Sequence, residues 1–401
     1  MFTLKKLAGG AIALSLAAST SLYATNGDTM IGVGAKTRAM GGAGIAFSQG
    51  AESTLVNPAL ITHVKETEIS FGGTIFMPDV HTDITFDPDG PGPAPLMTFG
   101  DDSDADISMI PAVALASRVG DNLYIGTGMW GTAGMGTDFR GNPGLFDMET
   151  TLQMMQFALP VAYKMGGLSV GIAPIVQYGS LDIHYTYMGT NVGDGQHQDF
   201  GFGVNLGATY DFGNGITLGA VYKSKVKMDY GDALSAAATP FGIAVGSHLD
   251  QPAEYGIGLG WRSGPHGIAI DWKRIQWGSA EGYKQFGWKN QNVFAVGYQY
   301  DAGDWALRVG YNHGKMPITL SNGTNPARDM FNLLGFPATV ENHITAGGSY
   351  VFNKNFSADF TVAYALEKKT SADISNMFGP GAKIENTHHQ LGFSVQLNYK
   401  F

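Results

Sequence analysis

No cysteine occurs among the 401 residues, which excludes a disulfide framework and a lipid-anchored cysteine. Charge is scarce: 14% of the residues are Asp, Glu, Lys or Arg, whereas soluble proteins carry about a quarter. The formal net charge of −10 argues against nucleic acid as a partner, because phosphates require a basic footprint. After residue 24 the chain also lacks any apolar run of ~20 residues, the length that a membrane-spanning helix needs. Low charge without long apolar runs is typical of a membrane β-barrel, whose apolar residues are spread over every second position.

Residues 1–24 have the composition of a secretory signal peptide. Lys5 and Lys6 precede an apolar run over residues 7–18, and small and polar residues then lead to Ala24. The run is too short to remain as a membrane anchor, for which ~20 residues are needed. We therefore predict that residues 1–24 are a cleaved signal peptide.

Alternation of apolar and polar residues dominates the rest of the chain. Between residues 391 and 401 every odd-numbered residue is apolar and every even-numbered residue is small or polar. This is the period of a β-strand with one apolar face. Alternation recurs at about fourteen places, each of about ten or more residues, as in tilted transmembrane strands. The predicted strands are 65–77, 106–119, 122–136, 149–165, 168–187, 198–212, 215–229, 251–263, 266–277, 288–301, 304–316, 340–352, 355–369 and 385–401.

The connections between these segments alternate in length. Tight turns, such as 166–167 and 302–303, alternate with longer links, as periplasmic turns and extracellular loops do in outer-membrane barrels. A β-propeller or a β-helix would show a sequence repeat, and none is visible. We therefore predict an all-β fold in which residues 65–401 form a transmembrane antiparallel β-barrel of about fourteen strands. The predicted outer loops are 78–105, 137–148, 188–197, 230–250, 278–287, 317–339 and 370–384.

Residues 25–64 do not alternate, and we predict that they form a hatch inside the barrel. Their glycines permit tight bends in a confined space, and an Asn-Pro-Ala element suits the cap and first turn of a short helix. A linker rarely carries so many apolar residues, and a phosphate loop is unsupported because no lysine follows the glycines. We expect residues 25–30 to be the mobile end, because nothing there can anchor strongly. The predicted hatch signature is Gly41, Gly42, Asn57, Pro58 and Ala59.

The same stretch resembles the FadL-type outer-membrane transporters of long-chain fatty acids and other hydrophobic compounds. The resemblance rests on residues 38–44 (RAMGGAG) and 57–62 (NPALIT). It implies uptake of hydrophobic compounds, above all long-chain fatty acids, by hatch-gated diffusion in the outer membrane of a Gram-negative bacterium. It also implies a lateral exit at a kink in the third strand, where glycines break the apolar parity. The predicted kink residues are Gly131, Thr132, Ala133 and Gly134.

Two groups of residues are candidates for ligand contact. Inward-facing basic residues are candidates for binding a carboxylate head group: Arg308, Lys273, Arg262 and Lys223. The sequence leaves open the alternative that lumen charges pair with one another. Because the loop 188–197 is very short, we expect ligand capture at the loop 230–250. Its candidate residues are Leu234, Phe241, Ile243 and Val245.

Other function classes lack their motifs. No spacing singles out a catalytic set, so we predict no enzyme, with a barrel protease or phospholipase as the less favoured alternative. A passive porin, the other alternative, would use a charged constriction instead of an apolar plug. The acidic link 78–105 does not complete a calcium loop, so we expect no metal and no cofactor. The expected partners are a hydrophobic small molecule, outer-membrane lipids and lipopolysaccharide, and a barrel-assembly machinery that recognises Phe401 of a monomeric chain.

Overall fold

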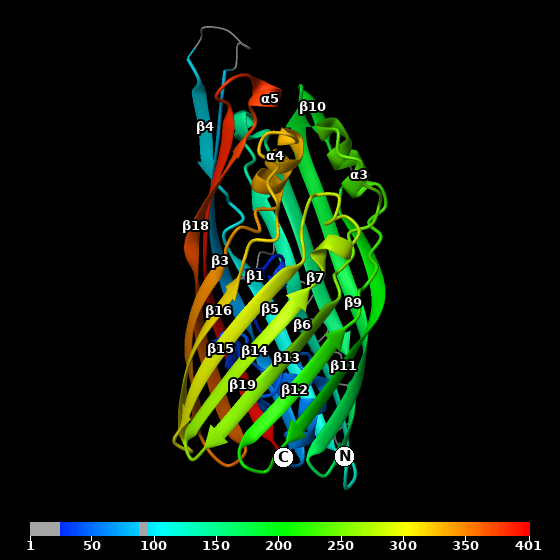
Figure 1. The fold of residues 1–401 in the computed structure, drawn as a ribbon, viewed down its shortest axis with the longest axis vertical. Helices are drawn as coiled ribbons and strands as arrows, with labels where there is room; N and C mark the ends of the chain where they lie inside the picture. The colour runs from blue at the N-terminus through cyan, green and yellow to red at the C-terminus, as the bar shows by residue number, and fades with distance from the viewer. Residues whose placement is uncertain (1–24, 88–94, 194) are drawn as a thin grey trace.

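A computed structural model, which describes residues 25–87, 95–193 and 195–401, shows a closed β-barrel (Figure 1). Fourteen antiparallel strands form its wall. The ring closes where β19 (Lys383–Lys400) pairs with β3 (Thr67–Phe86). Short turns lie at one end of the barrel and long loops at the other. The prediction of an all-β, fourteen-stranded barrel is confirmed.

The wall strands pair with their neighbours in sequence order. β7 (Glu149–Ala158) and β8 (Val161–Met165) form one wall strand, interrupted at Leu159 and Pro160, and both pair with β9 (Leu168–Tyr187). Proline has no backbone N–H to contribute to the ladder, which explains the interruption. The remaining wall strands are β5 (Ser108–Arg118), β6 (Leu123–Asp138), β11 (His197–Asp211), β12 (Ile216–Lys223), β13 (Glu254–Ser263), β14 (His266–Ile275), β15 (Gln291–Asp301), β16 (Trp305–Gly314), β17 (Asn342–Val351) and β18 (Phe356–Asp373).

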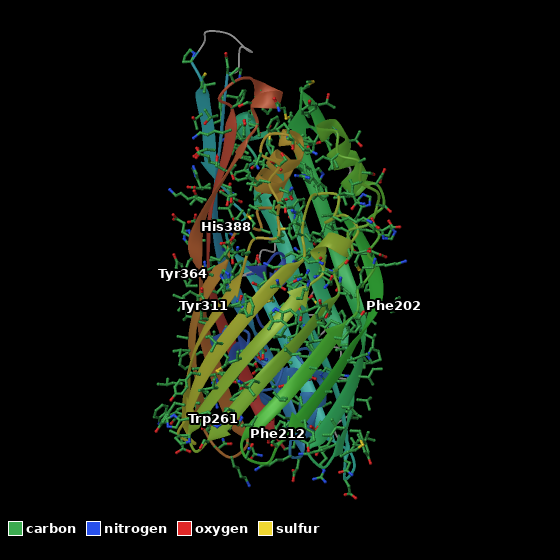
Figure 2. All side chains as sticks on the ribbon, in the orientation of Figure 1. Phe202, Phe212, Trp261, Tyr311, Tyr364 and His388 are labelled. Atoms are coloured by element: carbon green, nitrogen blue, oxygen red, sulfur yellow. The ribbon has the colours of Figure 1, made fainter. Side chains whose placement is uncertain are left out.

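The two faces of the wall differ in polarity, as the alternation requires. Large apolar side chains point outward, among them Phe202, which is 74% exposed, and Tyr364 (Figure 2). The inward face carries small and polar residues such as Ser394 and Gln396, which are buried. An Arg or Lys facing lipid near the bilayer centre costs about 2–4 kcal/mol, so this apolar belt suits a membrane. None of the helices in the described residues is long and apolar enough to cross a membrane.

Two predicted boundaries differ most from the structure. Residues 78–86 were predicted to begin an outer loop, but they continue β3 and form a hairpin with β4 (Met97–Asp102). This hairpin lies at the outer end of the barrel beside the ends of β18 and β19 (Figure 1), where a strand tolerates acidic residues. β12 ends at Lys223, although a strand was predicted up to residue 229. The chain bends inward there because Gly201 of β11 leaves room for Val226, whose side chain would lie 2.4 Å from a Cβ at that glycine.

Helices of the long loops cover the outer end of the barrel (Figure 1). They are α3 (Ala233–Ala238), η4 (Thr239–Phe241), α4 (Pro326–Gly335) and α5 (Ser375–Phe378). The side chain of Asn325 accepts a hydrogen bond from Arg328 N and caps α4, which has Pro326 at its start. Phe331 of α4 stacks on Phe286 with 5.0 Å between the ring centroids. The loops thus pack on one another through a shared apolar core, called the cap below.

Residues 25–64, called the N-terminal segment below, lie inside the ring of strands (Figure 1). Their hydrogen bonds reach strands in different parts of the wall, among them β9, β14 and β18. Asn57 caps η2 by accepting a hydrogen bond from Ala59 N at 3.1 Å. The elements of the segment are the hairpin formed by β1 (Thr25–Asn26) and β2 (Thr29–Met30), helix α2 (Ala35–Ala39), and the 3₁₀ helices η1 (Gly50–Thr54) and η2 (Pro58–His63).

Candidate functional site

The wall strands contact the N-terminal segment at glycines, where a side chain would collide with the segment. A Cβ at Gly310 of β16 would lie 2.1 Å from the backbone nitrogen of Gly41. A Cβ at Gly207 of β11 would lie 1.9 Å from Oδ1 of Asn57. Gly41 itself has a φ of 68°, which a residue with a side chain rarely adopts. The other predicted signature residues lie in the same packed layer: Gly42, Pro58 and Ala59.

Polar side chains of the wall bind the backbone of the segment. Asp271 of β14 accepts hydrogen bonds from the backbone N–H groups of Gly44 and Ile45, at 2.7 and 2.9 Å. Thr345 of β17 donates a hydrogen bond to the carbonyl of Ala39 at 2.9 Å. Buried backbone groups need such partners in the absence of water. The middle of the segment is therefore fixed to the wall through its backbone.

The third wall strand, β6, is irregular at the predicted kink. Its register with β7 shifts between Gly131 and Ala133, which marks a β-bulge. Its ladder with β5 ends at the pair of Ala112 and Trp130, although β5 continues its ladder with β3 as far as Ser108. In the described residues beyond Trp130, β6 therefore has a free edge toward β5. The four residues predicted for the kink lie at this place: Gly131, Thr132, Ala133 and Gly134.

The hairpin of the N-terminal segment lies on this free edge. Thr29 pairs with Ala133, and the carbonyl of Asp28 accepts a hydrogen bond from Gly134 N at 3.0 Å. The Asp28 carboxylate is fully buried and accepts hydrogen bonds from the hydroxyl of Tyr283 and, at 3.2 Å, from Thr29 Oγ1. Burial raises the pKa of Asp28 to about 6. The expectation that nothing at this end of the chain can anchor is wrong, because the partner Tyr283 lies 255 positions away in sequence.

One apolar cluster extends from the cap to the β6 bulge. Its outer part centres on Phe241, whose ring centroid lies 5.3 Å from that of Tyr185 and 5.5 Å from that of Phe331. Its lower end includes Ala133 and Met135 of β6. Between the two parts lies an aromatic triad with centroids 4.7 to 5.0 Å apart: Trp277, Tyr283 and Trp288.

The residues predicted for ligand capture belong to this cluster. Leu234, Phe241 and Ile243 are buried, and Val245 packs against them. They form the inside of the cap instead of an exposed patch. Tyr185 Oη donates a hydrogen bond to a carbonyl of α3 at 2.6 Å, which holds this helix on β9. Capture at this loop would therefore require the cap to open.

Two of the predicted head-group residues, Lys223 and Lys273, face a cavity of about 80 Å³ between the N-terminal segment and the wall. Both pair with Glu254, at 3.1 and 3.7 Å. This is the mutual pairing that the sequence left open. The apolar residues that line the cavity include Ile31, Val33, Leu55, Val56, Ile175 and Ile275. The cavity thus combines apolar walls with charges that the protein already neutralises.

The other two, Arg262 and Arg308, line a second cavity of about 240 Å³. Arg308 donates hydrogen bonds to Gln299 at 2.8 Å and to Ser349 at 2.6 Å. The Arg262 guanidinium lies 3.6 Å from the ring centroid of Phe47. Both side chains are therefore engaged by the protein itself.

Sequence reasoning missed two charged residues of the N-terminal segment, Asp28 and Arg38. Both are fully buried. Asp28 lies among Asn26, Gly27 and Thr29, and Arg38 lies two residues from Lys36, so no local pattern marks either charge as buried. Whether such a charge has a partner depends on strands that are remote in sequence.

A closed barrel with an apolar outer face and a lumen occupied by its own N-terminal segment defines a transmembrane β-barrel transport protein. The chain belongs to the family described as outer membrane protein transport protein (OMPP1/FadL/TodX), which it matches over residues 12–262 and 271–401. The predicted family is confirmed, and the family is one of transport proteins, not enzymes. Family and fold indicate an outer-membrane location. The predicted signal peptide, residues 1–24, lies outside the described residues.

Several solved structures share the fold. A FadL homologue from Pseudomonas aeruginosa has a TM-score of 0.72 at 15% identity, and the match covers 94% of this chain and 100% of that chain. For the toluene transporter TodX of Pseudomonas putida the TM-score is 0.68 at 17% identity, with 94% and 100% covered. For the toluene transporter TbuX of Ralstonia pickettii it is 0.65 at 18% identity, with 92% and 98% covered. Identities this low show the fold alone.

A curated relative from Chlorobium limicola is 35% identical over 133 residues. It is described as an uncharacterized protein in the phosphoenolpyruvate carboxykinase gene 5' region. The match spans 32% of this chain and 60% of that relative, so the chain covers less than two thirds of its length.

Proposed function

We propose that this protein takes up hydrophobic compounds with a long alkyl chain, long-chain fatty acids first among them, across the outer membrane of a Gram-negative bacterium. Transport is by diffusion, with the N-terminal segment as the hatch, and ends with lateral exit into the membrane between β5 and β6. The observation that carries the proposal is the contact of the β1–β2 hairpin with the free edge of β6. One element thereby closes the lower end of the apolar cluster and covers the irregular part of the wall.

The apolar cluster provides affinity for an alkyl chain. Each buried CH₂ group contributes ~0.8 kcal/mol, so a chain of about 16 carbons has ample driving force to enter. Release is then the difficult step and requires a moving part. The hairpin suits this role because the hydrogen bonds of Asp28 and Thr29 hold it to the loop and to β6. Beyond the last β5–β6 pair, at Ala112 and Trp130, the described residues of the two strands are not paired with each other, and this part of the wall is called the seam below. Withdrawal of the hairpin from β6 would connect the apolar cluster to the seam.

Two alternative functions are distinguished by the experiment described below. TodX and TbuX are described as toluene transporters, so a small aromatic hydrocarbon is the second substrate class. A general porin would pass polar solutes. The N-terminal segment packs its backbone against wall glycines in the middle of the lumen, which suits that function poorly.

Further partners follow from the outer surface. We propose that the apolar belt faces outer-membrane lipids and lipopolysaccharide, and that the chain acts as a monomer because the whole path lies within one barrel. Phe401 is exposed, and its ring centroid lies 4.9 Å from that of Tyr399. Its recognition by the barrel-assembly machinery stays a prediction.

A disulfide between hairpin and wall tests the gate. The chain has no cysteine, so the double variant Thr29→Cys with Ala133→Cys can form one intramolecular disulfide only. The bond from Gly134 N to the Asp28 carbonyl makes Thr29 and Ala133 a non-hydrogen-bonded pair. The Cα atoms of such a pair lie about 4.5 Å apart, a distance that a disulfide can span. We expect oxidation to abolish uptake of labelled oleate by cells that express the full chain, and reduction to restore it.

The single variants Thr29→Cys and Ala133→Cys are the controls and should transport oleate at the wild-type rate under the same oxidant. Wild-type uptake by the oxidised double variant would contradict gating at this contact. Uptake of labelled toluene without uptake of oleate would assign the protein to small aromatic hydrocarbons. Steady ion conductance in planar bilayers, unchanged by deletion of residues 25–62, would favour the porin.

A further inference from the structure

Arg38 is a buried cation without a counterion among the residues that the structure describes. Its side chain lies in α2 and is fully buried. Nη1 approaches the sulfur of Met30 at 3.9 Å, while Nε and Nη2 have no hydrogen-bond partner among the described residues. Burial alone lowers the pKa of Arg38 to about 10, and no charged partner offsets this effect. The guanidinium therefore keeps its charge at neutral pH.

Lys36, on the same helix, shows that the fold can neutralise a cation at this depth. Its ammonium group lies 3.6 Å from Glu52 and 3.4 Å from Asp359. Arg38 has no such carboxylate within the described residues, although it is the more deeply buried of the two. An unpaired buried charge costs several kcal/mol. An anion from outside the chain would remove that cost.

The groups around Arg38 are neutral and unsatisfied. Nη2 packs against Gly392 of β19, where a Cβ would lie only 3.1 Å away, so the guanidinium fits beside the wall because this residue has no side chain. His343 of β17 is fully buried and lies within electrostatic range of Arg38. Neither of its ring nitrogens has a hydrogen bond within 3.5 Å among the described residues, although the side chain of Gln390 is close enough to interact with the ring. Gln390 of β19 leaves its Oε1 unpaired. His343 and Gln390 are both opposite Ala365 of β18, so they flank the same point of the wall.

This polar group borders the bulge of β6. Gln390 Nε2 lies 2.9 Å from Nε2 of His388, and both residues line a small cavity of about 20 Å³ together with Gly134 and Met135. On the other side, Met30 joins Arg38 to a small apolar cluster with Phe76 of β3 and Ile110 of β5. Ile110 lies just beyond the last β5–β6 pair, which is at Ala112. A charged site and an apolar seam therefore meet at Met30.

We propose that Arg38 binds the carboxylate head group of an amphiphilic ligand, with His343 as a second donor. A guanidinium suits this role because its N–H groups match a carboxylate in a bidentate manner. The head group lies at Arg38 beside Gly392, and the alkyl tail lies along Met30, Phe76 and Ile110 toward the seam. The site deepens the proposed function, on which it rests, because it names the residues that hold the carboxylate of the ligand. It replaces the four cations predicted from sequence, all of which have protein partners.

A comparison of hexadecanoate with hexadecan-1-ol tests the site, because the two ligands share the tail and differ in the head group. Affinities are measured on the purified full chain in detergent at pH 7.5 by tryptophan fluorescence. We expect the wild type to bind the acid at least about tenfold more tightly than the alcohol, since a charged hydrogen bond contributes about 1.5–3 kcal/mol. The variant Arg38→Gln should lose this preference while its affinity for the alcohol stays the same. The variant Arg38→Lys should keep part of the preference.

Lys36→Gln is the matched control, since it removes a lumen cation from the same helix and should keep the preference for the acid. An equal loss of acid and alcohol binding in Arg38→Gln would make Arg38 structural and overturn the site. Heat-modifiable gel mobility shows whether Arg38→Gln folds. If it does not fold, the test is the ratio of acid affinity to alcohol affinity in the wild type and in Arg38→Lys. Equal affinity of the wild type for acid and alcohol would overturn the carboxylate site and leave the disulfide test of the gate untouched. Absence of binding for both ligands would overturn the site and the alkyl-chain substrate together.

Discussion

The two parts of the N-terminal segment are held in different ways. Residues 35–62 contact the wall backbone to backbone on glycines, and polar wall side chains bind their main chain. The hairpin at residues 25–30 is held by the hydrogen bonds of Asp28, by Gln251, which donates to Thr29 at 3.2 Å, and by one short contact with β6. Both polar atoms of the Asn26 side chain are buried without a partner among the described residues. Separation of the hairpin therefore breaks few bonds, whereas displacement of residues 35–62 breaks many.

The largest expected effect comes from the glycine contacts. In the variant Gly310→Val the new side chain would collide with the backbone of Gly41, where a Cβ alone would approach to 2.1 Å. We expect a loss of at least about 3 kcal/mol in the free energy of unfolding, because neither backbone can move away. Urea unfolding followed by gel mobility measures it. Gly120→Val is the control, since the nearest atom there is 3.7 Å away. An unchanged urea midpoint for Gly310→Val would show that residues 35–62 are not held more firmly than the hairpin.

A smaller and more local effect is expected from the Asp28 anchor. Tyr283→Phe removes the hydroxyl that donates to Asp28 and leaves the aromatic triad in place. Loss of a hydrogen bond to a carboxylate costs about 1.5 kcal/mol or more, so the undocked fraction of the hairpin should rise roughly tenfold. Electron paramagnetic resonance of a spin label at position 25 measures this fraction. The unfolding midpoint should stay the same. A fall in that midpoint as large as for Gly310→Val would show that the hairpin and residues 35–62 unfold as one unit.

The smallest expected effect is a pH dependence of hairpin docking. Because burial raises the pKa of Asp28 from 3.8 to about 6, the docked hairpin binds a proton more tightly than the undocked one. Docking is therefore strongest below the ordinary pKa of 3.8 and weakens as the pH rises through about 6. From about pH 5 to about pH 7 the loss is about 1 kcal/mol. The same spin label reports it. Asp28→Asn should give a flat profile, and an equal slope in that variant would assign the effect to another group.

The fold could be read from the sequence because the chemistry of a barrel wall is local. The alternation at residues 391–401 and the alternating loop lengths require no knowledge of distant residues. The cap of η2 by Asn57 is equally local. Residues 78–86 were misread because acidic residues suit both a loop and a strand that projects beyond the membrane.

The site was less predictable because its interactions join remote parts of the chain. The partner of Asp28 is 255 positions away, and the missing partner of Arg38 becomes visible only when every carboxylate has been placed. Parity placed Lys223 and Lys273 in the lumen, but it could not say that Glu254 lies between them. Apolar residues in the loop that contains Phe241 fit an exposed patch and a packed interior equally well, and the structure places them in the interior.

The early end of the β5–β6 ladder at Trp130 has a consequence for how solutes are sorted. In the proposed route a molecule leaves sideways, so it must dissolve in the lipid that surrounds the barrel. Selection then takes place by partition at the exit in addition to recognition inside. A polar solute that entered the cap would find no solvent on the far side of the seam and would return to the outside. The permeability barrier of the membrane is thereby preserved while the hatch is open.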